Sequence, residues 1–238
     1  MAETPITRDD ILLFLDCFRG RSDAIACQTT TGYYPINAGL DETTVEQHLS
    51  KCVTYAAYVL EKDSSCSFIC IDLDIPLAKV PTLDVSAFDQ KIAYLKAQLD
   101  HMHDGLTGDL GLKPDQILIE DTGGRGFHLW VVFQDPYPAK ATLAIKKALA
   151  IRSGADFEFF PKQGSLTPKL KLGNPIKLPL SLHRKYQGNS CFIVRDESGY
   201  HRVTGYADNI ARLRHLRRLT RPEIENLVIR AKEISGDA

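Results

Sequence analysis

Residues 117–133, ILIEDTGGRGFHLWVVF, place a glycine-rich turn between two strongly β-forming runs. The branched and aromatic residues on both sides predict paired strands, and three glycines permit a tight turn with close backbone approach. Backbone N–H groups in such a turn form an anion-binding concavity, and Arg125 adds a guanidinium fork that matches phosphate oxygens. His128 would lie on the second strand, facing the same ligand. The stretch predicts a hairpin that binds a polyanion, although an ordinary glycine hairpin with a structural histidine fits it equally well.

A second chemical signal lies in residues 68–76, FICIDLDIP, an apolar run interrupted only by Asp72 and Asp74. Because side chains at i and i+2 of a strand share a face, the two carboxylates lie side by side. Adjacent buried carboxylates repel each other, and a divalent cation removes that repulsion. Mg²⁺ or Mn²⁺ bound through carboxylates and substrate phosphates is typical of phosphoryl-transfer sites. The pair therefore predicts a metal site, with aspartates at a solvated strand end or on helix caps as the alternative.

The elements around these two motifs follow in the order β-α-β-β-α-β. After the first strand, the pattern predicts a helix over 87–102, the hairpin, a helix over 138–151 and a short strand over 156–161. That last strand carries a second acidic pair, Asp156 and Glu158. The order is typical of a ferredoxin-like or RNA-recognition-motif-like (RRM-like) sheet with two helices on one face. The predicted fold class is α+β, with the acids, the arginine and the histidine converging on the open face.

Residues 1–65 predict a smaller α/β unit packed against this core. Thr7 is a candidate N-cap for a helix over 8–18, and short strands and a second helix follow. Near the other end, Thr220 is a candidate N-cap for a final helix. We therefore expect three parts: the N-terminal unit over 1–65, an RRM-like unit over 66–208, and a basic segment with a helix over 209–238.

The composition indicates a soluble globular protein, because 44% of the 238 residues are hydrophobic and 25% are charged. The sequence has no apolar run of about 18 residues and its N-terminus is polar, so we expect a cytoplasmic protein without a membrane partner. Six cysteines without a C-x-x-C pair favour reduced, mostly buried thiols. The net charge of −1 conceals two basic segments without acids, residues 161–185 and 209–221.

Two further groups of basic residues are candidates for phosphate binding. Residues 172–183, LGNPIKLPLSLH, are extended and interrupted by prolines, and they offer Lys177 and His183. The earlier turn FRGRSD holds Arg19 and Arg21. Our first interpretation of these two arginines is that they bond to a neighbouring aspartate or to carbonyl groups. The second is that they contact a phosphate, a template or a second, initiating nucleotide.

Taken together, the motifs and their order resemble the archaeo-eukaryotic primase superfamily over roughly residues 68–183. The resemblance implies that Asp72 and Asp74 are metal ligands. For the third ligand, Glu158 fits the acidic strand of the family best, and Asp156 is the competing assignment. The residues that the resemblance assigns to the nucleotide's triphosphate are Thr122, where the family usually has serine, Gly124, Arg125, His128, Lys177 and His183.

The finer pattern is most similar to prokaryotic primase-polymerases of CRISPR-associated and related mobile or conflict systems. The stretches FRGRSD, FPKQ and LGNPIKLPL carry this similarity. No helicase or zinc module is visible in the sequence, so we expect an isolated catalytic core. The partners that the resemblance implies are a single-stranded DNA template and primer, nucleoside triphosphates, and CRISPR or replication-associated proteins.

The implied activity is that of a template-dependent DNA primase-polymerase. Such a nucleotidyltransferase joins a nucleoside triphosphate to a 3′-hydroxyl and releases pyrophosphate, with two divalent metals, Mg²⁺ or Mn²⁺. The two basic segments would hold the template backbone through phosphate contacts. Two alternatives stay open: a non-catalytic RRM-like nucleic-acid-binding module, and a nucleotide cyclase or nuclease on the same fold. Binding modules of this kind stack bases on aromatic residues of the sheet, whereas this sheet offers acids.

Overall fold

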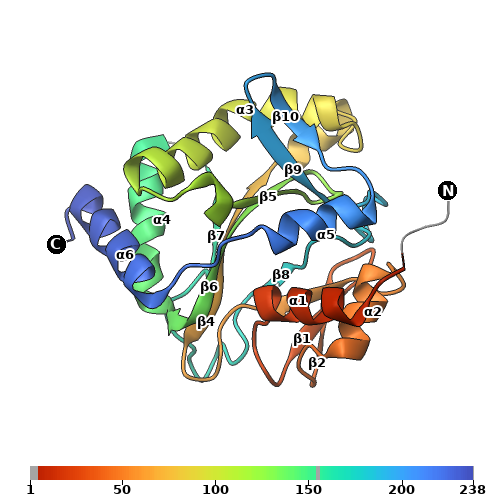
Figure 1. Ribbon diagram of the computed structural model, residues 1–238, viewed down its shortest axis with the longest axis horizontal. Helices are drawn as coiled ribbons and strands as arrows, with labels where there is room; N and C mark the ends of the chain where they lie inside the picture. The colour runs from red at the N-terminus through yellow and green to blue at the C-terminus, as the bar shows by residue number, and fades with distance from the viewer. Residues whose placement is uncertain (1–4, 154–155, 238) are drawn as a thin grey trace.

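The structure is a computed structural model that describes residues 5–153 and 156–237. Within these residues the strands form two antiparallel sheets (Figure 1). In spatial order, the larger sheet consists of β10 (Gly199–Arg202), β9 (Cys191–Asp196), β5 (Leu118–Asp121), β6 (Gly126–Pro138), β4 (Ser65–Asp74) and β7 (Glu158–Phe160). The smaller sheet consists of β2 (Tyr33–Ile36), β1 (Ile25–Gln28), β3 (Tyr55–Tyr58) and β8 (Pro175–Lys177).

The larger sheet contains the predicted β-α-β-β-α-β unit. Along the chain the unit runs β4, α3 (Phe88–Asp104), β5, β6, α4 (Ala139–Ser153) and β7. In space its strands lie in the order β5-β6-β4-β7, so the first strand is central and pairs with the third and the fourth. Both helices pack on one face of this sheet. The predicted α+β class and RRM-like order are therefore confirmed.

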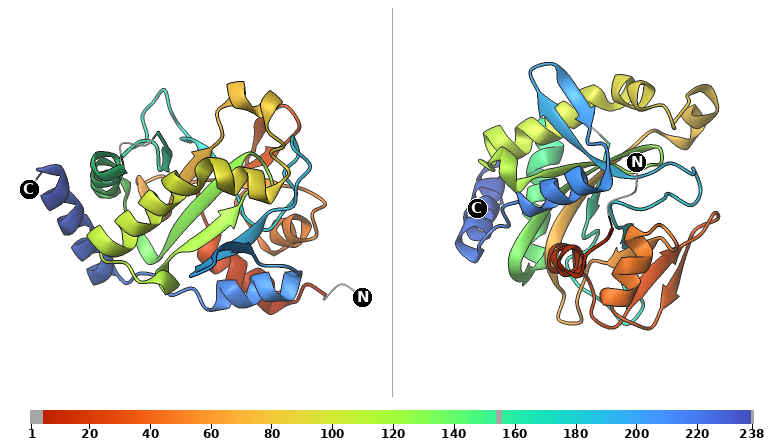
Figure 2. Two further views of the ribbon diagram at one scale, coloured as in Figure 1. Left: turned by 90° about the horizontal axis from the view of Figure 1, so that it is seen from above. Right: turned by 45° about the vertical axis from the view of Figure 1, so that its right-hand side comes forward.

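The opposite face of the larger sheet is covered by the N-terminal elements. Figure 2 (left) shows α3 in front of the sheet and the N-terminal elements behind it. Helix α1 (Arg8–Phe18) begins at Thr7, whose hydroxyl accepts from the Asp10 N–H, as the sequence predicts. At its other end, the ring of Phe18 packs edge-on against Trp130 of β6, with 5.2 Å between ring centroids. Helix α2 (Glu42–Leu49) packs against α1.

The two sheets are tied together by a strand that comes late in the chain. Strand β8 lies in the predicted extended stretch 172–183, yet it pairs with β3, where Lys177 lies opposite Ala56. One continuous apolar core also joins the two sheets. The division at residue 65 stays a prediction, and residues on both sides of it contribute to the smaller sheet.

Several connecting segments are more ordered than the sequence predicts. Helix α5 (Tyr206–Arg214) lies in a region expected only to be basic, and α6 (Arg221–Ser235) packs on α4. The expected loop over 105–115 holds a π-helical turn, η2 (Gly105–Asp109), and the start of a short 3₁₀ helix, η3 (Pro114–Gln116). A further 3₁₀ helix, η1 (Leu77–Thr82), follows β4. These short helices lack the long apolar periodicity on which sequence prediction depends.

The cysteines match their prediction: all six thiols are free, and only Cys52 is exposed. Among the described residues, no helix is both long enough and apolar enough to cross a membrane.

Candidate metal and nucleotide site

Four polar side chains form a row across the larger sheet. The backbone register places Glu120 of β5 opposite His128 of β6, His128 opposite Asp72 of β4, and Asp72 opposite Glu158 of β7. Residues directly opposite each other in antiparallel strands project from the same face. His128 shares its face with Trp130, which packs under α1, so the row faces away from α3 and α4. The sheet thus brings together two of the predicted metal ligands and one predicted nucleotide contact.

Asp72 is the unsatisfied member of this row. Its Oδ1 atom is buried and has no hydrogen-bond partner among the described residues, and the nearest ring nitrogen, His128 Nε2, is 3.6 Å away. Burial raises the pKa of Asp72 to about 7; His128 opposes this rise, and Asp74 and Glu158 add to it. Burial also raises the pKa of Asp74. An orphaned carboxylate oxygen beside a second carboxylate fits a divalent cation.

The third predicted ligand is placed next to the pair but is bonded elsewhere. Glu158 opens β7, its side chain is 57% exposed, and its Oε2 lies 2.8 Å from Lys162 Nζ. Asp156 precedes the strand and is exposed. The register therefore favours Glu158 over Asp156. Within the described residues, however, no three His, Cys, Asp or Glu side chains already form a metal cluster.

The predicted hairpin is confirmed, but two N–H groups of its turn form hydrogen bonds within the turn itself. The Gly123 N–H donates to Asp121, and the Gly124 N–H donates to the hydroxyl of Thr122. That hydroxyl in turn donates to the carbonyl of Gly126 at 2.9 Å. These two N–H groups therefore do not form the predicted anion-binding concavity, and Thr122 closes the turn. Local hydrogen bonds of this kind compete with ligand binding.

The side chain of Arg125 lies beside the candidate metal ligands. Its guanidinium bonds Asp74 Oδ2 at 2.5 Å and donates to the carbonyl of Ile75 at 2.5 Å. Arg125 was predicted to bind phosphate, and in this structure it orients a candidate metal ligand. A phosphate contact by Arg125 stays a prediction.

The glycines of the turn permit the close approach that the sequence predicts. A Cβ on Gly126 would overlap the carbonyl of Leu73 on the neighbouring strand. A Cβ on Gly124 would lie 2.6 Å from the ring of His183. The absence of a side chain at Gly124 therefore lets His183 reach the turn.

Sequence analysis missed one member of the row, Glu120. Its carboxylate is fully buried and accepts four hydrogen bonds, from His128 Nδ1, Trp130 Nε1 and Lys177 Nζ at 2.9 Å each and from Ser190 Oγ at 2.5 Å. Burial alone would raise the pKa of Glu120, but Lys177 and His128 hold it well below its usual range. An acid within the apolar run ILIED was the available signal.

The predicted phosphate-binding residues Lys177 and His183 lie on the same side of the site. Lys177 is 3% exposed, and its ammonium donates to Glu120 and to the Leu178 carbonyl. Burial, with Lys177 and His128 nearby, lowers the pKa of His183 to about 3, so its ring is neutral at physiological pH. The structure thus brings these residues together with His128, and their contacts with a nucleotide stay predictions.

Two residues of the smaller sheet also reach the site and were not predicted. The amide of Gln28 lies 3.5 Å from His183 Nε2 and donates to the hydroxyl of Tyr33 at 2.8 Å. Burial of that hydroxyl raises the pKa of Tyr33, and Asp72 and Asp74 contribute to the rise. Tyr33 is nevertheless 44% exposed as a residue, so its ring lies at the surface beside the carboxylates.

Most other predicted basic contacts have partners inside the protein. Arg21 bonds Asp23 at 2.5 Å and the Lys171 carbonyl at 3.0 Å, which confirms our first interpretation for that residue, while Arg19 is exposed. In the basic segment 209–221, the arginines that pair with acids are Arg214 with Asp10, Arg217 with Glu223 at 2.6 Å, and Arg218 with Asp16 at 2.7 Å. The expectation that this segment holds the template stays a prediction, and in the structure these three arginines bond acids of the protein itself.

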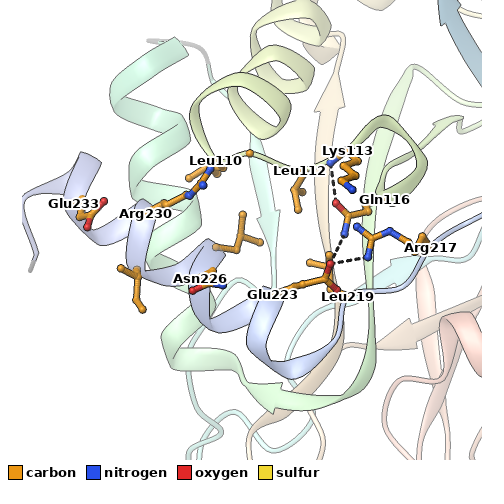
Figure 3. A pocket seen from close by; sticks show the side chains of 13 residues that line it. Leu110, Leu112, Lys113, Gln116, Arg217, Leu219, Glu223, Asn226, Arg230 and Glu233 are labelled. Atoms are coloured by element: carbon orange, nitrogen blue, oxygen red, sulfur yellow. Dashed lines mark hydrogen bonds and ion pairs between the residues drawn. The ribbon is translucent and has the colours of Figure 1, made fainter.

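A cavity of about 480 Å³ lies away from this row, between α6 and the loop that contains η3 (Figure 3). Its wall includes Arg217, Glu223 and Gln116, which bond to one another. No member of the carboxylate row lines it. This cavity is therefore not the candidate metal and nucleotide site, which consists of charged groups that the larger sheet brings together.

The sequence model described as "TOTE conflict system, Archaeo-Eukaryotic Primase domain" matches residues 9–227. The chain belongs to this family. Membership confirms the resemblance to a conflict-system primase-polymerase and supports a nucleotidyltransferase of the primase type. Members of this primase superfamily generally use divalent metals. A CRISPR association of this primase domain stays a prediction.

Solved structures that this chain matches include primases and polymerases. The primase-polymerase domain of cyanophage S-2L is 16% identical and covers 88% of this chain and 97% of its own, with a TM-score of 0.40. The catalytic domain of primase RepB′ in complex with initiator DNA is also 16% identical, covers 88% and 92%, and has a TM-score of 0.41. The polymerase domain of Mycobacterium tuberculosis ligase D in complex with DNA is 14% identical, covers 97% and 89%, and has a TM-score of 0.33. A search of curated proteins finds no match. The assignment of this primase domain therefore rests on the sequence match to the family.

Proposed function

We propose that the protein is a template-dependent DNA primase-polymerase that joins nucleoside triphosphates to a 3′-hydroxyl and releases pyrophosphate. The observation that carries the proposal is the buried, unpartnered Oδ1 of Asp72 beside Asp74 in a chain of the primase family. A buried carboxylate without a partner is costly unless a cation binds it. Oxygen donors are the ligands that Mg²⁺ and Mn²⁺ prefer.

Asp72, Asp74 and Glu158 would hold two divalent metals, Mg²⁺ or Mn²⁺, which when bound neutralise the reacting phosphates and activate the 3′-hydroxyl. Glu158 would exchange its contact with Lys162 for this role, and its exposure leaves it room to do so. Arg125 would keep Asp74 oriented through the bond that it already makes.

The triphosphate would bind where His128, Lys177 and His183 converge. An ammonium has three protons, and the two acceptors of Lys177 leave one proton for a phosphate oxygen. His183 is neutral and therefore would offer a hydrogen bond rather than a charge. Thr122 and Gly124 would act by shaping the turn against which His183 lies.

The DNA strand would run along the segment that follows β7. Lys169 and Lys171 are exposed there, in the segment that connects β7, the edge strand that carries Glu158, to β8. Exposed lysines contact phosphates without reading the base sequence. This basic loop, rather than the arginines of 209–221, is the proposed path for the template or primer.

Aromatic residues on the same sheet face speak against a non-catalytic RRM-like module. Phe68 and Trp130 are fully buried, and Phe18 of α1 packs on Trp130. Bases cannot stack on rings that the protein itself covers. The surface left open carries carboxylates, which repel nucleic acid in the absence of a metal.

The proposal is tested by synthesis on single-stranded DNA with Mg²⁺ or Mn²⁺, with and without a primer, and with ribonucleotides and deoxynucleotides separately. We expect wild-type protein and Asp196→Asn, a change in the exposed turn between β9 and β10, to make labelled products. Asp72→Asn should lose at least about 100-fold of this activity. Products without template would indicate a cyclase, and full activity of Asp72→Asn would refute the metal assignment.

A further inference from the structure

Glu120 cannot touch a substrate itself, because this member of the row is fully buried. It is nevertheless the only carboxylate bonded to two of the predicted nucleotide contacts, His128 and Lys177, in the part of the chain that the structure describes. Any influence of Glu120 on the reaction must therefore pass through these two side chains.

The contact with His128 fixes the imidazole ring. Glu120 pairs with the Lys177 ammonium, and an ionised carboxylate can only accept a hydrogen bond, so the geometry makes His128 Nδ1, 2.9 Å from Glu120 Oε2, the donor. The other ring nitrogen, Nε2, then faces Asp72. In metal and catalytic sites the partner of one imidazole nitrogen sets the orientation and tautomer of the other.

The contact with Lys177 joins the two sheets at the same point. Lys177 comes from β8 of the smaller sheet, whereas Glu120 and His128 come from the larger one. Ser190 and Trp130 supply two further donors to the carboxylate. Four donors fill the acceptor positions of a carboxylate, so Glu120 has little freedom to move.

We propose that Glu120 is a positioning residue that holds His128 Nε2 and the Lys177 ammonium toward the triphosphate of the incoming nucleotide. This inference rests on the proposed function. Fully satisfied buried networks are rigid, so the site would meet the nucleotide with both groups already in place. The alternative is that Glu120 is a core ion pair that contributes only to stability.

The first test measures His128 in the protein without nucleotide or metal. In ¹⁵N-histidine NMR spectra, with the His128 signal assigned by its loss in His128→Gln, wild type should show His128 with Nδ1 protonated. Glu120→Gln should change that signal, and the matched control Asp10→Asn should not. Asp10 is also buried and bonds an arginine, but it caps α1 and takes no part in the row. An unchanged His128 signal in Glu120→Gln overturns the inference.

The second test separates positioning from stability through kinetics. Glu120→Gln should raise the KM for the nucleotide at least about tenfold, as is typical when the hydrogen-bond partner that orients a binding residue is lost. Its affinity for single-stranded DNA should stay within about twofold of the wild-type affinity. Because Glu120 acts partly through His128, combining Glu120→Gln with His128→Gln should cost less than the two separate losses multiplied.

The remaining outcomes are also decisive. If Glu120→Gln does not fold, Glu120→Asp keeps the charge and withdraws the carboxylate by one methylene, and it should show the same rise in KM. A lower melting temperature with an unchanged KM and an unchanged His128 signal would assign Glu120 to stability alone. If wild type makes no product, the proposed function fails, whereas the NMR result still decides whether Glu120 orients His128.

Discussion

Asp72 and Glu120 are carboxylates that lie on either side of His128 in the same row, Asp72 with one buried oxygen and Glu120 fully buried. Glu120 accepts four hydrogen bonds, and its neighbours hold its pKa below the usual range. Asp72 has a buried oxygen without any bond, and burial raises its pKa to about 7. The carboxylate group is thus used in two ways, once to fix neighbouring groups and once to present an unsatisfied oxygen that fits a cation.

The difference separates the parts of the site that are complete from the part that needs a ligand. The groups around Glu120 are already bonded to its carboxylate, and they include Lys177, which the family resemblance assigned to phosphate. The carboxylates of Asp72 and Asp74 remain costly until they are neutralised. The unfavourable buried carboxylates therefore lie on one strand, β4, and the fully hydrogen-bonded carboxylate lies two strands away, on β5.

The largest expected effect is that substitutions of Glu120 and Asp72 change the stability of the protein in opposite directions. Glu120→Gln should lower the free energy of unfolding by about 3 kcal/mol, because it breaks a buried ion pair and leaves Lys177 uncompensated. Asp72→Asn should raise it by about 1 kcal/mol at pH 8 with EDTA, because burial, Asp74 and Glu158 disfavour the charge of Asp72 more than His128 offsets them. Urea unfolding of both variants measures this. The comparison breaks if the two substitutions shift stability in the same direction.

A third buried polar group, His48, extends the comparison to pH. Its Nδ1 accepts from the Tyr55 N–H and its Nε2 bonds the Pro179 carbonyl, while burial lowers its pKa to about 3. The unfolded chain binds a proton near pH 6.5 and the folded chain does not, so stability should fall as pH drops from about 6.5 toward 3. The loss is up to about 1.4 kcal/mol per pH unit.

Urea unfolding at pH 7, 6 and 5 tests the role of His48. His48→Gln should be less stable than wild type at pH 7, because it loses at least one of these bonds, but it should lose less on acidification. Parallel losses in wild type and variant would show that other groups carry the pH dependence.

The smallest effect is expected where the smaller sheet meets the site. Gln28→Ala removes the amide between His183 and Tyr33. The contact between Gln28 and His183 is long, at 3.5 Å, and partly buried. The KM for the nucleotide should therefore rise about threefold to fivefold, as for the loss of one modest hydrogen bond. Tyr33→Phe is the matched variant that keeps the ring and loses only the hydroxyl. A change in kcat without a change in KM would place these residues at the reacting atoms instead.

Local sequence patterns predicted the parts of the site that depend on neighbours along the chain. Alternation in a strand placed Asp72 beside Asp74, and the glycine turn indicated the hairpin. Glu120 was missed because its four partners come from three other segments of the chain, and only the strand register reveals them. The same limit explains β8 and the ion pairs of Arg214 and Arg218, whose partners are distant in sequence.

The role of Arg125 shows a different limit. Its residue type matched phosphate, and its position in the turn was predicted correctly. Which of several nearby anions it bonds depends on the side chain's direction, and in the structure that anion is Asp74. A motif therefore located the residue without fixing its partner.

Binding of Mn²⁺ to the protein without nucleotide tests the central claim most directly. Isothermal titration of wild type, Asp72→Asn and Glu120→Gln with Mn²⁺ compares the unsatisfied carboxylate with the saturated one. The account predicts that wild type and Glu120→Gln bind, and that Asp72→Asn loses at least about tenfold in affinity. Equal binding by wild type and Asp72→Asn would contradict it, because the unsatisfied oxygen of Asp72 would then not be a metal ligand.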